Sequence, residues 1–248
     1  MRRSLHWHYL FLLCIPAFFA SCTKDSDDTL RTPAEFYPLE VGRYIIWDVD
    51  SINYHEAIPN DTSHTQVKEI LVDTFYDNLG LLNYRIERYT RPDDTSDFML
   101  QNVWSVCQKG NNIEKTENNL RFIKLVAPVM DGVQWDGNAY LGGLFDLPYN
   151  EECNRLNYLE GWDYVYANLD ASMEINGMPF DRTVTVNESG ADNLIEYDNA
   201  TEIYAAGVGL IQKEFYHYYT QDLSCPDCPW TQRVQCGYSV IMRIVAYH

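Results

Sequence analysis

Five cysteines are spread through the body of the chain, and thiols can cross-link, bind metals or carry redox chemistry. Cys225 and Cys228 form a Cys-x-x-Cys pair, and Cys236 follows closely. A tetrahedral zinc would need His217 or His248 as a further ligand, while a redox pair needs a helix start that lowers a thiol pKa. We instead predict a disulfide that clamps the last long loop. The disulfide candidates are Cys107, Cys153, Cys225, Cys228 and Cys236.

Carboxylates could serve a glycosidase, but the chain has 36 Asp and Glu residues, so pairs will lie close by chance. The pairs of interest are Asp48 with Asp50, Asp131 with Asp136, and Glu151 with Glu152. Nothing marks any pair as desolvated, and no loop has the ligand spacing of a calcium site. Serine-elbow, β-lactamase and His-Glu-x-x-His motifs are absent from the sequence. We therefore predict no catalytic residue, no metal and no cofactor.

Aromatic residues are the remaining lead, with 19 tyrosines and six tryptophans. The run 215–219 (FYHYY) places Tyr216 and Tyr218 on one face of a strand. Exposed rings bind sugars or peptides at low entropic cost, whereas rings in a sheet pack across strands. Trp135 and Trp162 lie in or beside an irregular segment, so we expect them to be more exposed than tryptophans within strands. The candidate ligand-binding residues are Trp135, Trp162, Tyr216 and Tyr218.

The elements that must position these residues are strands. From residue 43 onward, runs rich in Tyr, Ile, Val, Thr and Trp alternate with Asn, Asp, Gly and Pro clusters, such as the hairpin turn at 77–80 (DNLG). Only 151–161, within the irregular region 128–161, has helical spacing. We predict an all-β fold, either an antiparallel sandwich or a curved, partly closed barrel of about ten strands, with at most one short helix. The predicted strands are 43–54, 67–76, 82–90, 98–108, 113–117, 120–127, 162–169, 182–187, 193–197, 209–220 and 239–247.

The first 21 residues have the layout of a secretory signal peptide. Arg2 and Arg3 precede an apolar stretch from Tyr9 to Ala20, which is too short to span a bilayer as a helix. The residues Ala20-Ser21-Cys22 resemble the lipobox of bacterial lipoproteins, although Phe19 stands where that family usually has leucine. This resemblance implies that the signal is cut before Cys22 and that this cysteine carries the lipid. An anchor with two or more acyl chains holds a protein in its leaflet stably.

The segment that follows Cys22 is polar, contains two prolines and has no periodicity, so we predict a lipidated tether over residues 22–38. Its end-to-end distance would be roughly 20 Å. The residues Lys24-Asp25-Ser26-Asp27-Asp28 resemble the signal that exports Bacteroidota-type lipoproteins to the outer face of the outer membrane. Residues 39–248 are predicted to form a single antiparallel β domain.

Two further segments resemble uncharacterised Bacteroidota-type outer-membrane and cell-surface lipoproteins. Residues 36–47 (FYPLEVGRYIIW) contain a Pro-Leu-x-x-Gly turn that leads into the first strand. Residues 203–211 (IYAAGVGLI) contain a Tyr-Ala-x-Gly-Val-Gly-Leu element near the end of the chain. The resemblance implies a location at the outer membrane or cell surface and a β fold, and it implies no activity.

Charge narrows the possible partners. The formal net charge is −18, and removal of residues 1–21 takes away Arg2 and Arg3 but no acid, which leaves 36 acidic and 16 basic residues and a charge of −20. This potential repels phosphate backbones, so nucleic acid is excluded as a partner. We expect a non-catalytic binding or assembly accessory, anchored by lipid in the outer membrane at the cell surface or on the periplasmic side. Its ligand would be a glycan or another envelope protein. The alternatives are a glycan-directed surface hydrolase that uses carboxylates of the 128–161 loops, and an open β-barrel that carries lipid in an apolar interior.

Overall fold

The structure is a computed structural model that describes residues 30–56, 58–142, 159 and 161–248. It contains twelve strands and two short α-helices in this part of the chain. In chain order they are α1 (Pro33–Phe36), β1 (Tyr44–Tyr54), β2 (Asp61–Tyr76), β3 (Leu82–Arg91), β4 (Met99–Lys109), β5 (Asn112–Glu117), β6 (Leu120–Leu125), β7 (Gln134–Trp135), β8 (Asp163–Ile175), β9 (Met178–Asp192), β10 (Glu196–Ala205), β11 (Gly209–Tyr219), α2 (Trp230–Arg233) and β12 (Cys236–Tyr247).

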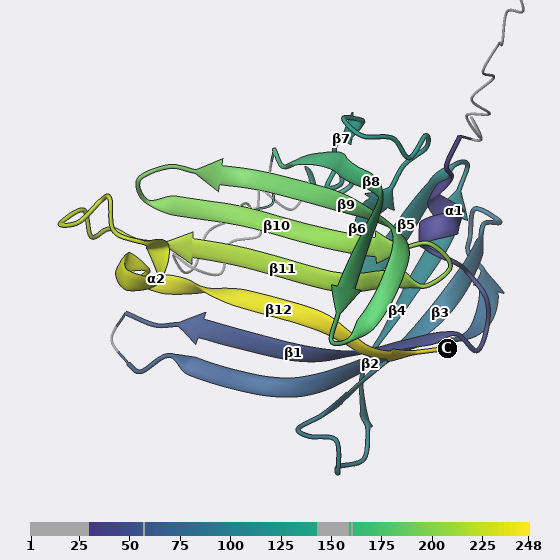
Figure 1. Ribbon diagram of the computed structural model, residues 1–248, viewed down its shortest axis with the longest axis horizontal. Coiled ribbons are helices and arrows are strands. Elements are labelled where there is room, and N and C mark those ends of the chain that lie inside the picture. Colours follow the sequence, from purple (N-terminus) through teal and green to yellow (C-terminus); the bar gives the residue numbers. More distant parts are fainter. Residues whose placement is uncertain (1–29, 57, 143–158, 160) are drawn as a thin grey trace, which may run out of the picture.

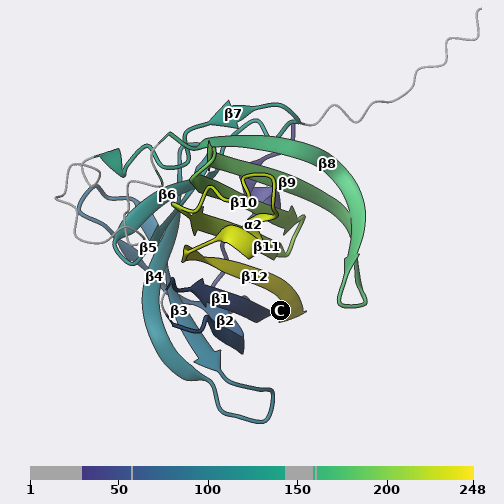
Figure 2. The same ribbon diagram turned by 90° about the vertical axis from the view of Figure 1, so that its left-hand side faces the viewer.

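All twelve strands belong to one antiparallel sheet, in the order β6-β5-β4-β3-β2-β1-β12-β11-β10-β9-β8-β7. Each half of the chain forms a meander, and the first strand pairs with the last at the centre of the sheet. Figures 1 and 2 show that the sheet curls, so that β4–β6 lie opposite β9–β12 across an interior. The all-β prediction is therefore confirmed, in the form of a curved sheet.

Local sequence explains the tight turns between the strands. Asn176 and Gly177 join β8 to β9, and both have positive φ angles (51° and 76°), as a two-residue hairpin turn requires. Between β2 and β3, one carboxylate oxygen of Asp77 accepts the backbone N–H groups of Leu79 and Leu81, both at 2.9 Å. Asn176 thus suits its turn through a conformation that most other residues rarely adopt, and Asp77 stabilises its turn through side-chain hydrogen bonds.

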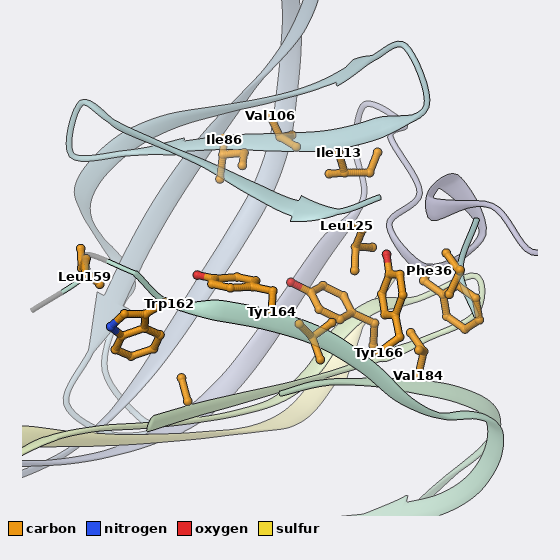
Figure 3. Close-up of a cluster of buried hydrophobic side chains, with 14 of the residues drawn as sticks. Phe36, Ile86, Val106, Ile113, Leu125, Leu159, Trp162, Tyr164, Tyr166 and Val184 are labelled. Atoms are coloured by element: carbon orange, nitrogen blue, oxygen red, sulfur yellow. The ribbon is translucent and has the colours of Figure 1, made fainter. Parts of the chain in front are cut away.

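The interior of the curled sheet holds the larger hydrophobic cluster (Figure 3). Trp162, directly before β8, and Tyr164 and Tyr166 at its start pack against residues from α1 and from strands on the opposite wall. These contacts bury the inward faces of both meanders, which is the main source of stability for such a sheet. The buried members include Phe36, Leu71, Ile86, Val106, Ile113, Leu125, Val129, Val184, Val186, Ala200 and Tyr204.

The two edge strands of the sheet are neighbours in the chain, and they approach one another without pairing as strands in the described residues. The backbone N–H of Ile123 on β6 donates to Gly137 O at 2.8 Å, and the indole N–H of Trp135 on β7 donates to Ile123 O at 2.9 Å. The sheet is therefore bridged at this seam but is not closed into a barrel.

Several boundaries differ from the sequence prediction. The count is twelve strands instead of about ten, and β7 lies inside the predicted irregular region. The predicted strand 193–197 is mostly a turn, and the strand there, β10, begins only at Glu196. Two short helices are present instead of at most one. The helical candidate 151–161 falls almost entirely outside the described residues. No helix in the described segments is long and apolar enough to cross a membrane.

The last part of the predicted tether, which the sequence analysis placed at 22–38, packs onto the sheet from Arg31 onward. Arg31 forms an isolated bridge with Val129, and α1 follows with Phe36 fully buried in the interior cluster. Glu35 of α1 also pairs with Arg182 on β9 at 3.0 Å. The chain from Arg31 onward therefore packs onto the sheet, because one buried aromatic ring supplies apolar contacts that polar composition does not reveal.

Gly190 on β9 provides a test of this packing. A Cβ atom at this position would lie 2.3 Å from Trp162 Nε1 and 2.8 Å from the Cβ of Asp198, so the glycine lets the indole pack against the strand. We expect Gly190→Ala to lower the free energy of unfolding by about 1–3 kcal/mol through overpacking. Urea denaturation measures this change. Gly142→Ala is the matched control, since its Cβ would meet nothing within 4 Å. Equal stability of the two variants would contradict the packing described here.

Candidate functional site

The interior also contains a cavity of about 340 Å³. Its lining comes from strands on both walls, from the segment after α1 and from the residues that precede β8. Asn118, in the turn between β5 and β6, is exposed and lines the same cavity, so the cavity reaches the surface at that turn. This volume lies within the range of natural small-molecule sites.

Charged side chains occupy much of the cavity wall. Among the described residues, four glutamates and five basic residues line it, although the protein as a whole is strongly acidic. They are Glu69, Glu117, Glu188, Glu202, Arg43, Arg88, Lys115, Lys124 and Lys213. Buried charges are costly unless they are paired, so the partner of each one matters.

Glu202 on β10 is the centre of one ionic network. Its Oε1 lies 2.7 Å from both Lys124 Nζ on β6 and Lys213 Nζ on β11, and its Oε2 accepts the Tyr204 hydroxyl at 2.5 Å. Burial alone would raise the pKa of the Glu202 carboxyl, but the two ammonium groups outweigh it and hold the pKa well below its usual range. Glu202 is therefore ionised, and it ties the two walls of the cavity together.

A second network lies nearer the β5–β6 turn. Lys115 Nζ on β5 lies 2.9 Å from both Glu69 Oε2 and Glu117 Oε1, and Arg88 pairs with Glu69 at 2.5 Å. Burial alone would raise the pKa of Glu117, but the nearby lysines, Lys115 foremost, lower it to about 2. Arg88 and Lys115 also lie over the ring of Trp104, at 4.7 and 4.8 Å from its centroid.

Glu188 on β9 differs from the other three glutamates. Its nearest cation is Lys124 Nζ, at 3.5 Å from Oε1, and this oxygen is buried with no hydrogen-bond partner. Burial, and then the negative charge of Glu202, raise the pKa of the Glu188 carboxyl from 4.5 to about 7. Glu188 and Glu202 are thus two neighbouring carboxyls whose pKa values are driven in opposite directions.

Aromatic and aliphatic side chains supply most of the rest of the wall. Phe215 on β11 stacks on Trp162 (centroids 5.7 Å apart, planes at 16°) and on Tyr238 of β12 (5.2 Å, 8°). All three rings line the cavity. Such a rigid aromatic wall beside polar groups suits a ligand that has both apolar and hydrogen-bonding surfaces.

The chemistry of the lining favours one kind of ligand. Carboxylates are acceptors only, and ammonium and guanidinium groups are donors only, so a hydroxyl group, which does both, can bind at any of them. A hydrocarbon chain would bury these charges without replacing their hydrogen bonds. A polyanionic ligand would be repelled by the four carboxylates.

The ligand-binding residues that the sequence predicted have other surroundings. The expectation that Trp162 is exposed is wrong, since 1% of it is accessible and it stacks inside the sheet. Trp135 is half-buried against Tyr166, with ring centroids 4.5 Å apart, and it bridges the seam. Tyr218 is buried by ring contacts with Tyr54 and Tyr197 (centroids 5.3 and 6.0 Å apart).

Tyr216, the fourth of these candidates, is half-buried and donates its hydroxyl to Glu214 Oε2 at 3.0 Å. Burial, and then this carboxylate, raise the pKa of Tyr216 to about 12. Tyr216 and Tyr218 do not line the cavity, and the same is true of Trp135. Of the four candidates, the structure brings only Trp162 to the cavity wall.

The cysteines follow the disulfide prediction in part. Cys225 and Cys228 are bonded to each other in the connection between β11 and β12, so this pair offers no thiolate to a metal. Cys236 is disulfide-bonded as well. Cys107, in contrast, is a free thiol, buried on β4 beneath Arg121, and burial raises its pKa. Its inclusion among the disulfide candidates is therefore wrong. Cys22 and Cys153 lie outside the described residues.

The carboxylates that the sequence analysis singled out accept hydrogen bonds in turns, in loops and on β1. Asp131 Oδ1 accepts the N–H of Leu169 at 2.8 Å, and Asp136 Oδ1 accepts the N–H of Asn138 at 2.9 Å. Asp48 and Asp50 bind side chains of β2, and neither lines the cavity. Glu151 and Glu152 fall outside the described residues.

Sequence reasoning missed the charged residues of the cavity. A signal for them exists in the alternation of the strands, because Val184, Val186 and Glu188 share one face of β9 and the two valines are fully buried. A charged residue at an inward position is informative since it needs a buried partner. The sequence alone does not name that partner, which comes from another strand.

Comparison of the chain with known protein families, curated proteins and solved structures found no match.

Proposed function

We propose that this protein is a lipid-anchored, non-catalytic binding protein of the bacterial outer membrane, and that it takes a short glycan into the cavity of its curled sheet. The observation that carries the proposal is the cavity wall, where nine charged side chains with both donors and acceptors stand beside stacked aromatic rings. A sugar presents hydroxyl groups to the charges and apolar ring faces to the aromatics. The volume of about 340 Å³ suits one or two sugar rings.

The first prediction distinguishes a ligand site in the cavity from a ligand site at the aromatic residues on the other face of β11. Trp104 lines the cavity and is half-buried, whereas Tyr216 does not line it. We expect Trp104→Leu to weaken the binding of a neutral disaccharide by about ten-fold, because an aromatic contact is lost. Tyr216→Leu, the control, keeps the affinity of the unchanged protein. Titration calorimetry on the full chain in detergent measures both, and the reverse pattern would move the site to the other face.

Turnover of a glycoside would show that the protein is a hydrolase and not only a binding protein. A glutamate with a pKa near 7 has the property that a general acid needs, and Glu188 has it. Chromogenic glycosides incubated with the full chain are expected to stay intact. Release of the chromophore that disappears in Glu188→Gln would establish a glycan-directed hydrolase, with an interior carboxyl in place of the loop carboxylates.

The anchor is a separate part of the proposal, supported by the lipobox-like residues Ala20-Ser21-Cys22. We expect cells fed with labelled palmitate to label this protein, and Cys22→Ser to abolish the label and release the protein on carbonate washing. Cys107→Ser is the control, since Cys107 is buried in the fold. An unlabelled native protein, or one that carbonate removes, would overturn the anchored location.

A further inference from the structure

Glu188 has one unsatisfied hydrogen-bond acceptor within the cavity. Its Oε1 is inaccessible to solvent and has no hydrogen-bond partner, and the side chain is 3% exposed. A buried side-chain oxygen normally has at least one hydrogen-bond partner, and leaving it without one costs free energy. Since Glu188 also lines the cavity, a molecule bound there would lie beside the side chain whose oxygen lacks a partner.

The protein's own cations are already engaged elsewhere. Lys124 and Lys213 both make 2.7 Å contacts with Glu202, which leaves Lys124 at 3.5 Å from Glu188. Glu202 from β10, Lys124 from β6 and Lys213 from β11 face Glu188, and the Tyr164 hydroxyl from β8 forms a hydrogen bond with its carboxyl. Two carboxylates therefore share two ammonium groups, but both short contacts are made to the carboxylate of Glu202.

We propose that Glu188 receives an ammonium group of the ligand, so that the preferred ligand is an amino sugar. This inference rests on the proposed glycan binding and names the ligand class of the same cavity. An ammonium group brings three donors and a positive charge, which gives Glu188 the charge-assisted hydrogen bond that Lys124 does not supply. A neutral hydroxyl supplies only one ordinary donor. The rings of Trp162 and Tyr164, which also line the cavity, add aromatic surface that attracts a cation.

Binding of an ammonium group beside Glu188 is expected to change the protonation of its carboxyl. With its pKa near 7, Glu188 is about half protonated at neutral pH in the free protein. A bound ammonium group favours the ionised carboxylate, so the proton leaves Glu188 as the ligand enters. Proton release on binding is therefore a signature that a neutral sugar does not produce.

The test compares two disaccharides of glucosamine, one with free amines and one fully N-acetylated, in calorimetric titrations of the full chain at pH 7. We expect the free amine to bind about ten-fold more tightly or better, and its apparent enthalpy to change with the ionisation enthalpy of the buffer as protons are released. Glu188→Gln is expected to remove both the preference and the proton release. Glu214→Gln, the same change outside the cavity on β11, is expected to keep both.

The outcomes separate this inference from the proposed function. Equal affinity for the two disaccharides in the unchanged protein, without proton release, would overturn the amino-sugar inference and leave glycan binding in place. Binding of neither disaccharide would overturn both. The comparison within the unchanged protein decides the matter even if Glu188→Gln does not fold.

Discussion

Replacement of Glu202 by glutamine is expected to lower the free energy of unfolding by about 3 kcal/mol or more at pH 7, as measured by urea denaturation. The side chain keeps its size but loses its charge, so Lys124 and Lys213 lose their 2.7 Å partner. Lys124 is buried and retains only the more distant Glu188. A buried ammonium group left with one distant partner is more costly than a network in which its charge is matched.

Asp73→Asn is the control for this prediction, because Asp73 pairs with Arg85 at 2.8 Å on the exposed surface. Solvent screens such a pair, so we expect no resolvable change in its stability. If Glu202→Gln were as stable as this control, the ionic network would not hold the two walls together, and the description of the cavity would have to change.

The second large effect is a pH dependence that comes from Glu188. The pKa of its carboxyl is about 7 in the folded state against an ordinary value of 4.5. Below pH 4.5 the group is protonated in both states and has no effect on stability. Between pH 4.5 and 7 the unfolded chain releases this proton while the folded chain keeps it, so stability falls by about 1.4 kcal/mol per pH unit. Above pH 7 the loss is complete, at about 3 kcal/mol.

Glu188→Gln isolates this contribution, since glutamine does not titrate. Glu117 and Glu202 have lowered pKa values, which stabilise the fold at neutral pH and lose that effect in acid, but both remain in the variant. We expect the stability of Glu188→Gln relative to the unchanged protein to rise by about 3 kcal/mol from pH 4.5 to pH 8. Urea denaturation at intervals across this range measures the difference, and a difference that stays constant with pH would refute the raised pKa.

The strand pattern was predictable because it is local. The turn 77–80 and the alternation in 43–54 correspond to the β2–β3 hairpin and to β1. β8 and β9 were predicted too short, although Asn176-Gly177 is a strong hairpin signal at their junction. The pairing of β1 with β12 depends on contacts between the two ends of the chain, which no local pattern reveals.

The candidate site was not predictable for a similar reason. Lys124, Glu202 and Lys213 lie on three strands and meet only because the sheet curls. In the sequence, each of them resembles an ordinary solvated charge on a strand. Aromatic content directed attention to Tyr216 and Tyr218, whereas the ring packing around Tyr218 accounts for its burial.

A crystal structure of the full chain soaked with a glucosamine disaccharide tests the central claim most directly, because it shows where the ligand lies. We predict density for the sugar inside the curled sheet, in contact with Glu188 and with the aromatic wall formed by Trp162, Phe215 and Tyr238. Density on the other face of β11, beside Tyr216 and Tyr218, with none in the cavity, would contradict the account.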